Sequence, residues 1–318
     1  MYKRKSIVLL FFPIDYLCNM RNLKDWVIAT RPWSFPASFI PVLAIGAFLT
    51  DYNSRNGGGP VDWIPLLIAV VMMVVFQAAG NLISDYYDHV RGVDQADSLN
   101  QVRAIQSGTF TPRELLFYGY CVLAAGAMIG VILLFLTSWK LIWLGVAAIL
   151  SVIFYMWLKA HVLSGLTILF CYSILPAIGA SYVGTGSLVP LVIPVSLPFG
   201  LLTVAILHAN NTRDIQGDRR AGVLTFAASI GDRASRWIYA AEVATPYVLV
   251  LVFALVDWIP WWTLLTWLTV PLALPLVRTM VSIPPEDAEA IATIDQKTAR
   301  LQLAFGLLYT ISFFLALI

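Results

Sequence analysis

Residues 189–220 read VPLVIPVSLPFGLLTVAILHANNTRDIQGDRR, and this stretch decides the fold class of the chain. Its first part, residues 189–209, is an apolar run that is long enough to cross a bilayer, because a membrane helix needs about 20 mostly apolar residues. Its last part brings Asn, Asp and Arg residues together where that run ends. The stretch therefore predicts a membrane helix that ends in a polar, charged site.

The composition of the whole chain agrees with this pattern. Of its 318 residues, 59% are hydrophobic and 12% are charged, whereas a soluble domain is about 45–50% apolar and about 25% charged. So little charge excludes a soluble enzyme, a disordered chain and a nucleic-acid-binding protein. We expect an all-α, multi-pass membrane protein with nine transmembrane helices, over residues 35–49, 64–84, 114–136, 139–158, 165–183, 189–209, 237–256, 258–280 and 300–318.

The basic residues orient these nine spans. All Lys and Arg residues except Arg55 and Lys140 fall before the first span, in the connections that follow even-numbered spans, or at the span ends that border those connections. Because basic loops stay on the cytoplasmic side, we expect a cytoplasmic N-terminus and an outside C-terminus. We also expect residues 1–19 to be a dispensable extension before a start at Met20, followed by one transmembrane domain over residues 20–318.

The first acidic motif closes the second expected span. Asn81, Asp85 and Asp88 stand at i, i+4 and i+7, which places them on one face of a helix. Ser84 lies beside them. The following segment adds Arg91 and Asp94.

The second acidic motif closes the sixth expected span. Asn211, Asp214 and Asp218 are spaced i, i+3 and i+7, and Asn210 fits the same face at i, i+4 and i+8. Both motifs are thus expected at the same leaflet. Carboxylates that lie close together repel each other. A bound Mg²⁺ relieves that repulsion, and substrate phosphates usually complete its coordination. The spacing fits a Mg²⁺-diphosphate site, and simple capping of helix ends by the acids is the alternative that stays open on spacing alone.

These motifs resemble the paired Asp-rich motifs of the UbiA superfamily of intramembrane prenyltransferases. Residues 210–222 (NNTRDIQGDRRAG) are most similar to its MenA branch, the 1,4-dihydroxy-2-naphthoate polyprenyltransferases. Residues 30–38 (TRPWSFPAS), 91–94 (RGVD) and 103–108 (RAIQSG) also resemble that branch. The chain departs from the family pattern in having Ser84 at the first-motif Asn, Val223 where many members have Lys, and Ser164-Gly165 at the start of the fifth helix.

The resemblance implies a nine-helix fold and a reaction. The catalytic residues would be Asp85, Asp88, Asp214 and Asp218, which would hold Mg²⁺. The donor would be a polyprenyl diphosphate and the acceptor an aromatic ring. In the MenA branch, the prenyl group replaces the naphthoate carboxyl group, with loss of CO₂. The implied site lies on the cytoplasmic side of the cell inner membrane, and the product belongs to menaquinone biosynthesis.

Further polar residues are candidates for substrate contacts. Asn81, Asn210 and Asn211 would contact metal or phosphate, and Ser84 and Arg91 lie beside the first motif. Arg103, Arg213 and Lys159 would contact the diphosphate, or would anchor the cytoplasmic side. Tyr155 precedes Lys159 by one turn, and Asp94 would orient a loop or the acceptor. We expect His208 at the membrane interface.

Two alternatives remain open on the residues alone. The acceptor of a prenyltransferase could be a 4-hydroxybenzoate or a homogentisate in place of the naphthoate. In a different class, a transporter would use intramembrane acids as an ion pathway. That reading requires charges near the middle of the bilayer, whereas the acids of this chain cluster at one leaflet.

Overall fold

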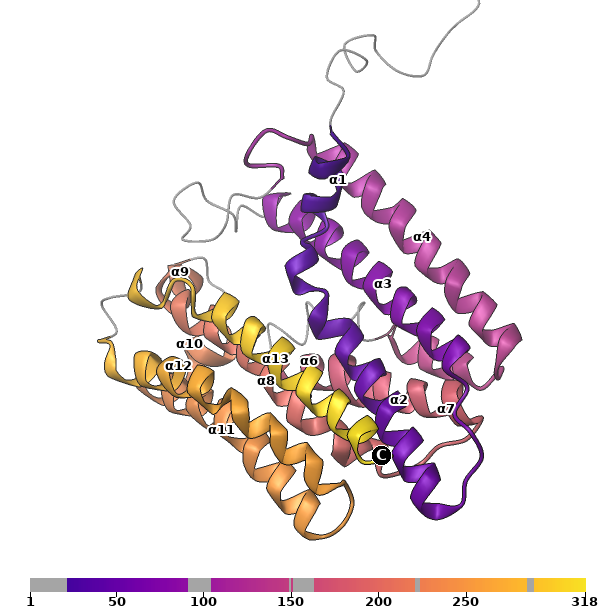
Figure 1. Cartoon of the computed structure of the whole chain (residues 1–318). Coiled ribbons are helices and arrows are strands. Elements are labelled where there is room, and N and C mark those ends of the chain that lie inside the picture. Colours follow the sequence, from indigo (N-terminus) through magenta and orange to yellow (C-terminus); the bar gives the residue numbers. More distant parts are fainter. Residues whose placement is uncertain (1–21, 91–103, 149, 151–162, 221–223, 285–288) are drawn as a thin grey trace, which may run out of the picture.

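The structure is a bundle of helices (Figure 1). It is a computed structural model that describes residues 22–90, 104–148, 150, 163–220, 224–284 and 289–318. In this part of the chain, eight helical segments are long and apolar enough to cross a membrane, and no residue is in a β-strand. The predicted all-α membrane fold is confirmed, and the expected extension over residues 1–19 and Met20 lie outside the described residues.

The membrane-spanning segments consist of α2 (Pro36–Asn56), α3 (Trp63–Val90), α4 (Pro112–Leu136), α6 (Ser164–Leu169) continued by η3 (Phe170–Ile174) and α7 (Leu175–Thr185), α8 (Val192–Arg213), α11 (Asp232–Leu255), η4 (Trp261–Thr269) continued by α12 (Val270–Ser282), and α13 (Ile294–Leu315). The shorter elements are α1 (Leu23–Ala29), η2 (Pro32–Ser34), α9 (Ile215–Arg220), α10 (Phe226–Ile230) and η5 (Glu289–Ile291).

Eight of the nine expected spans coincide with these segments, although several ends differ. α11 begins at Asp232 and α13 at Ile294, each about one and a half turns before the expected start. Both first turns contain an acidic residue, Asp232 and Asp295, and a negative charge stabilises a helix N-terminus. The search for apolar runs excluded these charged turns, although they continue the helices.

The fourth expected span, residues 139–158, is described over 139–148 and at 150, and residues 141–148 are helical. Its remaining residues lie outside the described ranges, so the count of nine stays a prediction. The described spans before and after it are α4 and the segment formed by α6, η3 and α7. Lys140, just after α4, lies 5.9 Å from the ring centroid of Tyr182 in the last turn of α7. The two successive described spans therefore end on the same side of the bundle.

The helices differ in how far they are enclosed. Only 17% of the most apolar window of α4 is buried, whereas 67% of that of α8 is buried. The outer surface is apolar: Phe117 and Phe135 of α4 are 72% and 88% exposed. Such a surface suits lipid and not water. α8 is therefore the central helix, and its C-terminal end carries the second acidic motif.

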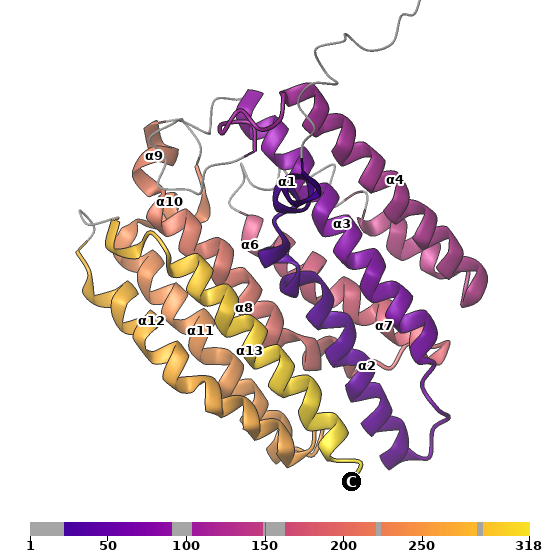
Figure 2. The same cartoon turned by 45° about the horizontal axis from the view of Figure 1, so that its top comes forward.

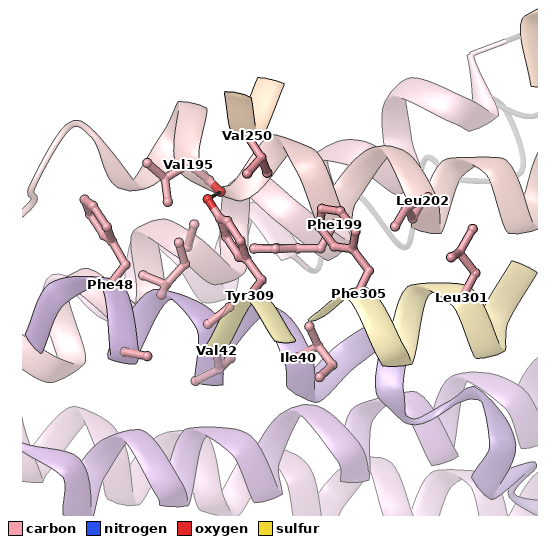
Figure 3. Packing of buried hydrophobic residues seen from close by; sticks show 14 of the residues in the cluster. Ile40, Val42, Phe48, Val195, Phe199, Leu202, Val250, Leu301, Phe305 and Tyr309 are labelled. Atoms are coloured by element: carbon pink, nitrogen blue, oxygen red, sulfur yellow. Dashed lines mark hydrogen bonds between the residues drawn. The ribbon is translucent and has the colours of Figure 1, made fainter. Parts of the chain in front are cut away.

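The core around α8 is tightly packed (Figure 3). Tyr309 of α13 is fully buried, and its hydroxyl donates to the carbonyl of Val195 in α8 at 3.2 Å. Gly306, one turn before Tyr309, lets α13 approach α2 so closely that an added Cβ would overlap Ile40. Small residues commonly allow such contacts between membrane helices. This packing fixes α8 relative to α2 and α13.

The two ends of the bundle differ in which charged residues they carry. α1, the C-terminal end of α3, and α9 lie at one end, and the C-terminus of the chain lies at the other (Figures 1 and 2). Arg55 and Lys140 belong to the second end: Arg55 donates to the carbonyl of Trp258 between α11 and η4, and Lys140 follows α4. The acidic motifs and the basic residues around them therefore share the first end, which we call the motif end.

Candidate active site at the motif end

The first acidic motif is held by the segment that leads into α2. The guanidinium of Arg31, between α1 and η2, forms an ion pair with the carboxylate of Asp85 in α3. Asp85 is 3% exposed, and a carboxylate at that depth requires a partner. Arg31 also adopts a left-handed backbone conformation (φ 55°, ψ 63°), which costs about 1–2 kcal/mol for a residue with a side chain. The surrounding contacts must therefore hold it.

Asn81 supplies such contacts one turn before Asp85. Its side-chain amide donates to the carbonyl of Thr30 and to the hydroxyl of Ser34, both at 2.8 Å. These bonds connect α3 with the residues on both sides of Arg31. In the structure, Asn81 thus fixes the segment that positions Arg31 against Asp85, while its expected contact with metal or phosphate remains a prediction.

The second motif contains a forked ion pair at the end of α8. Arg213 donates from Nε and Nη2 to the two carboxylate oxygens of Asp214, both at 2.8 Å. Its Nη2 also donates to Asn210 at 3.0 Å, and its Nη1 donates to the carbonyl of Ala292 at 3.1 Å. The side chain of Asp295 in α13 lies 3.6 Å away. Because Arg213 is buried, it links the motif to α13 and orients Asp214.

Asp218 follows on the next turn. α8 ends at Arg213, and α9 begins after Asp214. The backbone N–H of Asp218 nevertheless donates to the carbonyl of Asp214 at 2.8 Å, so the spacing of one helical turn is preserved. The hydroxyl of Thr225 donates to the Asp218 carboxylate at 3.2 Å and accepts from the N–H of Ala228 as the N-cap of α10. α10 thereby positions Asp218.

A buried polar network lies directly behind the second motif. The two ring nitrogens of His208 lie 2.8 Å from Glu242 and 2.9 Å from the hydroxyl of Ser235, both in α11. Thr212 contacts the same Ser235 hydroxyl at 2.6 Å. His208 is 4% exposed, so it faces the bundle interior, and its expected depth at the membrane interface stays a prediction. The network fixes the last two turns of α8 against α11.

The other expected site residues are placed as follows. Ser84 is exposed in α3, and Asn211 is half-buried near the end of α8. Asp88 lies in α3, on the turn after Asp85, and its side chain is outside what the structure describes. The residues outside the described ranges are Arg91, Asp94, Arg103, Tyr155 and Lys159.

The acids do not form a preassembled metal cage in the described part of the chain. There, no group of three or more His, Cys, Asp or Glu side chains is arranged to hold a metal ion. Asp85 and Asp214 each face a guanidinium. The available donors are carboxylate and amide oxygens, which suit Mg²⁺ when substrate phosphates complete its coordination. The donor set therefore fits Mg²⁺ together with a diphosphate.

Sequence reasoning missed three features of this end. Arg31 stands directly before Pro32 in the segment 30–38, and only its pairing across 54 positions marks it as part of the site. Glu242 and Ser235 complete the partners of His208 from another helix. A polar residue inside an apolar span is the available signal for such contacts, since polar groups in membrane helices usually face the bundle interior.

The fold and these two clusters define the class of the protein: an intramembrane helical bundle with paired acidic motifs at one end. A sequence model described as the UbiA prenyltransferase family matches residues 37–316. The chain belongs to this family, whose members are prenyltransferases.

Curated relatives support this membership. UbiA prenyltransferase domain-containing protein 1 of Danio rerio is 34% identical over 300 residues, covering 92% of this chain and 84% of the relative. The Homo sapiens protein of the same name is 32% identical over 301 residues, with the same coverage. The Drosophila melanogaster homolog is 30% identical, covering 92% of this chain and 79% of the relative. These names confirm the expected superfamily and do not confirm the naphthoate branch.

Solved structures share the fold. A structure of digeranylgeranylglyceryl phosphate synthase superposes with a TM-score of 0.57 at 17% identity, covering 91% of this chain and 98% of that one. A UbiA homolog from Archaeoglobus fulgidus bound to DMAPP and Mg²⁺ superposes with a TM-score of 0.55 at 14% identity, covering 90% of this chain and 99% of that one. At these identities, the likeness concerns the fold.

Proposed function

We propose that this protein transfers a polyprenyl group from a polyprenyl diphosphate to an aromatic acceptor in a Mg²⁺-dependent reaction at the motif end. One observation carries the proposal: the acidic motifs of α3 and of α8–α9 share one end of the bundle (Figure 2), and an acid of each motif pairs with an arginine. Family membership supports the reaction type. The Archaeoglobus homolog bound to DMAPP and Mg²⁺ supports the donor and the metal.

Asp85, Asp88, Asp214 and Asp218 would hold the metal together with the diphosphate oxygens. Mg²⁺ bound there would neutralise the charge that develops on the departing diphosphate. Arg31 already pairs with Asp85 at the motif end. The parallel N–H donors of its guanidinium suit phosphate oxygens as well as carboxylates. Arg213 is bound to Asp214 and to α13. We therefore assign it the role of orienting Asp214.

The reaction breaks the bond between the allylic carbon and the diphosphate oxygen, and the diphosphate leaves with the electron pair. A carbon atom of the acceptor ring then forms the new bond to the allylic carbon. A dihydroxynaphthoate loses its carboxyl group as CO₂, whereas other rings lose a proton. The apolar helices exclude water, which would otherwise capture the allylic cation.

For the acceptor, we propose 1,4-dihydroxy-2-naphthoate, on the similarity of residues 210–222 to the MenA branch. The acceptor of 4-hydroxybenzoate or homogentisate type is the alternative. We further propose that the motif end faces the cytoplasm in the inner membrane. The concentration of basic residues at this end supports that orientation.

A radiolabelled transfer assay tests this function. Purified protein would be incubated with Mg²⁺, a labelled prenyl diphosphate and each of the three acceptor types, and the labelled lipid product would be extracted. We expect transfer to the naphthoate, and none when EDTA removes the metal. Preferential transfer to another ring would correct the acceptor, and the absence of transfer to any aromatic ring would refute the proposal.

A further inference from the structure

α3 carries a line of polar side chains that continues from the first motif into the membrane. Gln77, Asn81 and Asp85 are spaced i, i+4 and i+8 and so share one face of the helix. Polar residues inside a membrane helix are costly unless they have partners, and they mark functional sites. Asp85 and Asn81 belong to the motif end. Gln77 lies about 12 Å below Asp85, at a rise of 1.5 Å per residue, and has no role in the reaction described so far.

Gln77 is the centre of a hydrogen-bond chain. The phenol of Tyr172 donates to its side-chain carbonyl at 2.7 Å. The amide of Gln77 in turn donates to Asn81 and to the hydroxyl of Ser34, both at 3.3 Å. All four side chains are half-buried. The chain therefore connects a tyrosine in the bundle interior with the residues that hold Arg31 against Asp85.

Tyr172 lies in an unusual element. Residues Phe170–Ile174 form η3, a π-helix between α6 and α7. π-Helical turns are rare, and they frequently occur at functional sites because the wider turn redirects the side chains that follow. In this turn, two consecutive side chains form hydrogen bonds to different helices. Tyr172 bonds to Gln77 of α3, whereas Ser173 donates to the carbonyl of Ser196 in α8 at 2.9 Å.

η3 consequently bridges the two helices that end in the acidic motifs. Gly200 of α8 approaches Ser173 so closely that an added Cβ would overlap it, and Gly200 lies ten residues, or about 15 Å, before Asn210. η3 is thus about two turns deeper than Asp85 along α3, and almost four turns deeper than Asp214 along α8.

We infer that Tyr172 and Gln77 bind the acceptor, with the phenol and the amide forming hydrogen bonds to a ring hydroxyl group. The inference rests on the proposed function and extends it to the acceptor subsite. Phenol and amide groups both donate and accept hydrogen bonds, so they match a hydroxylated ring and not a hydrocarbon tail. A ring bound there lies deeper in the bundle than a diphosphate that is held by Asp85.

Steady-state kinetics of the full-length protein test the inference. In Tyr172→Phe, the KM for 1,4-dihydroxy-2-naphthoate should rise about tenfold, because one hydrogen bond to the acceptor is lost. The KM for the prenyl diphosphate and for Mg²⁺ should change less than twofold. Wild-type protein should prefer this acceptor to 1-hydroxy-2-naphthoate, which lacks one hydroxyl group, and the variant should lose that preference. Gln77→Leu should give the same acceptor-specific effect if Tyr172→Phe does not fold.

Ser173→Ala is the matched control. It removes the bond from the same π-helix to α8 and leaves the α3 side intact, so the acceptor KM should stay at the wild-type value. An unchanged acceptor KM in Tyr172→Phe and Gln77→Leu would overturn the inference, as would a parallel rise in the KM of both substrates. If the wild-type protein transfers no prenyl group to any aromatic acceptor, the proposed function itself fails. That outcome is distinct from transfer that is insensitive to Tyr172.

Discussion

Arg31 and Asp85 form an ion pair that joins the segment before α2 to the first acidic motif. The pair is unusual on both sides, because Asp85 is almost fully buried and Arg31 holds a left-handed backbone conformation directly before a proline. Asn81 and Ser34 tie the neighbouring backbone to α3. The first motif is thus supported by a segment that precedes it by some 50 residues.

A double-mutant cycle measures this pair. Arg31→Ala leaves a buried carboxylate without its guanidinium, and we expect a loss of about 1–3 kcal/mol in unfolding free energy. Asp85→Asn removes the charge that needs compensation, so the double variant should lose less than the sum of the single changes. Thermal unfolding in detergent gives the coupling. Lys24→Ala, at an exposed position in α1, is the control and should have no effect.

The fork between Arg213 and Asp214 predicts that a conservative change is not tolerated. Lysine in place of Arg213 keeps the charge but cannot form two parallel bonds to the carboxylate and a third to Ala292. We expect Arg213→Lys to lose about 2 kcal/mol in stability and to raise the KM for the prenyl diphosphate. Arg220→Lys, on the exposed face of α9, should keep wild-type stability. Equal stability of the two variants would show that the fork does not anchor α8.

The network around His208 predicts a stability effect without a direct role in transfer. His208→Ala leaves Glu242 and Ser235 without their imidazole partner in a buried environment. The expected cost is about 2–3 kcal/mol, visible as a lower Tm. His89→Ala, at the exposed end of α3, should change the Tm little. An unchanged Tm in His208→Ala would contradict the structural role assigned to the network.

Two glycines predict close helix packing. An added Cβ at Gly306 would overlap Ile40, and one at Gly200 would overlap Ser173, so either change to alanine should destabilise the protein by about 1–3 kcal/mol. Gly80→Ala is a matched control on α3, since nothing lies within 4 Å of its added Cβ. Alanine there should be neutral or stabilising, because glycine is a poor helix former. Destabilisation in all three variants would argue against specific packing.

Apolar runs predicted the spans well where lipid determines the sequence. Residues 114–136 were expected as a span, and α4 begins at Pro112 and ends at Leu136. The same reasoning failed at charged first turns, such as that of α11, because a hydropathy pattern does not register an acidic residue that stabilises a helix N-terminus. It also could not predict the π-helix at Phe170–Ile174, whose altered register depends on contacts with α3 and α8.

The helical spacing of Asn81 with Asp85 and of Asp214 with Asp218 was predictable, since it depends on local geometry alone. The hydrogen-bond and ion-pair partners that come from distant parts of the chain were not predictable. Arg31 lies 54 positions from Asp85, and Tyr172 lies 95 positions from Gln77. Such pairs arise from how helices pack, which one sequence does not encode in any local pattern. Sequence reasoning therefore found the acids together with Asn81 and Arg213, and missed partners that come from distant segments, such as Arg31 and Tyr172.

The most direct test of the account compares acids at the two ends of the bundle. The transfer of a labelled prenyl group to an aromatic acceptor would be measured for Asp214→Ala, Asp218→Ala and Asp62→Asn, with Mg²⁺ in excess. Asp62 is exposed near the start of α3, away from the motif end. We expect transfer to fall by about a hundredfold or more in the first two variants, since each loses a carboxylate that would hold the Mg²⁺ required by the leaving diphosphate. Transfer by the third variant should be unchanged. Undiminished Mg²⁺-dependent transfer by folded Asp214→Ala or Asp218→Ala would contradict the account.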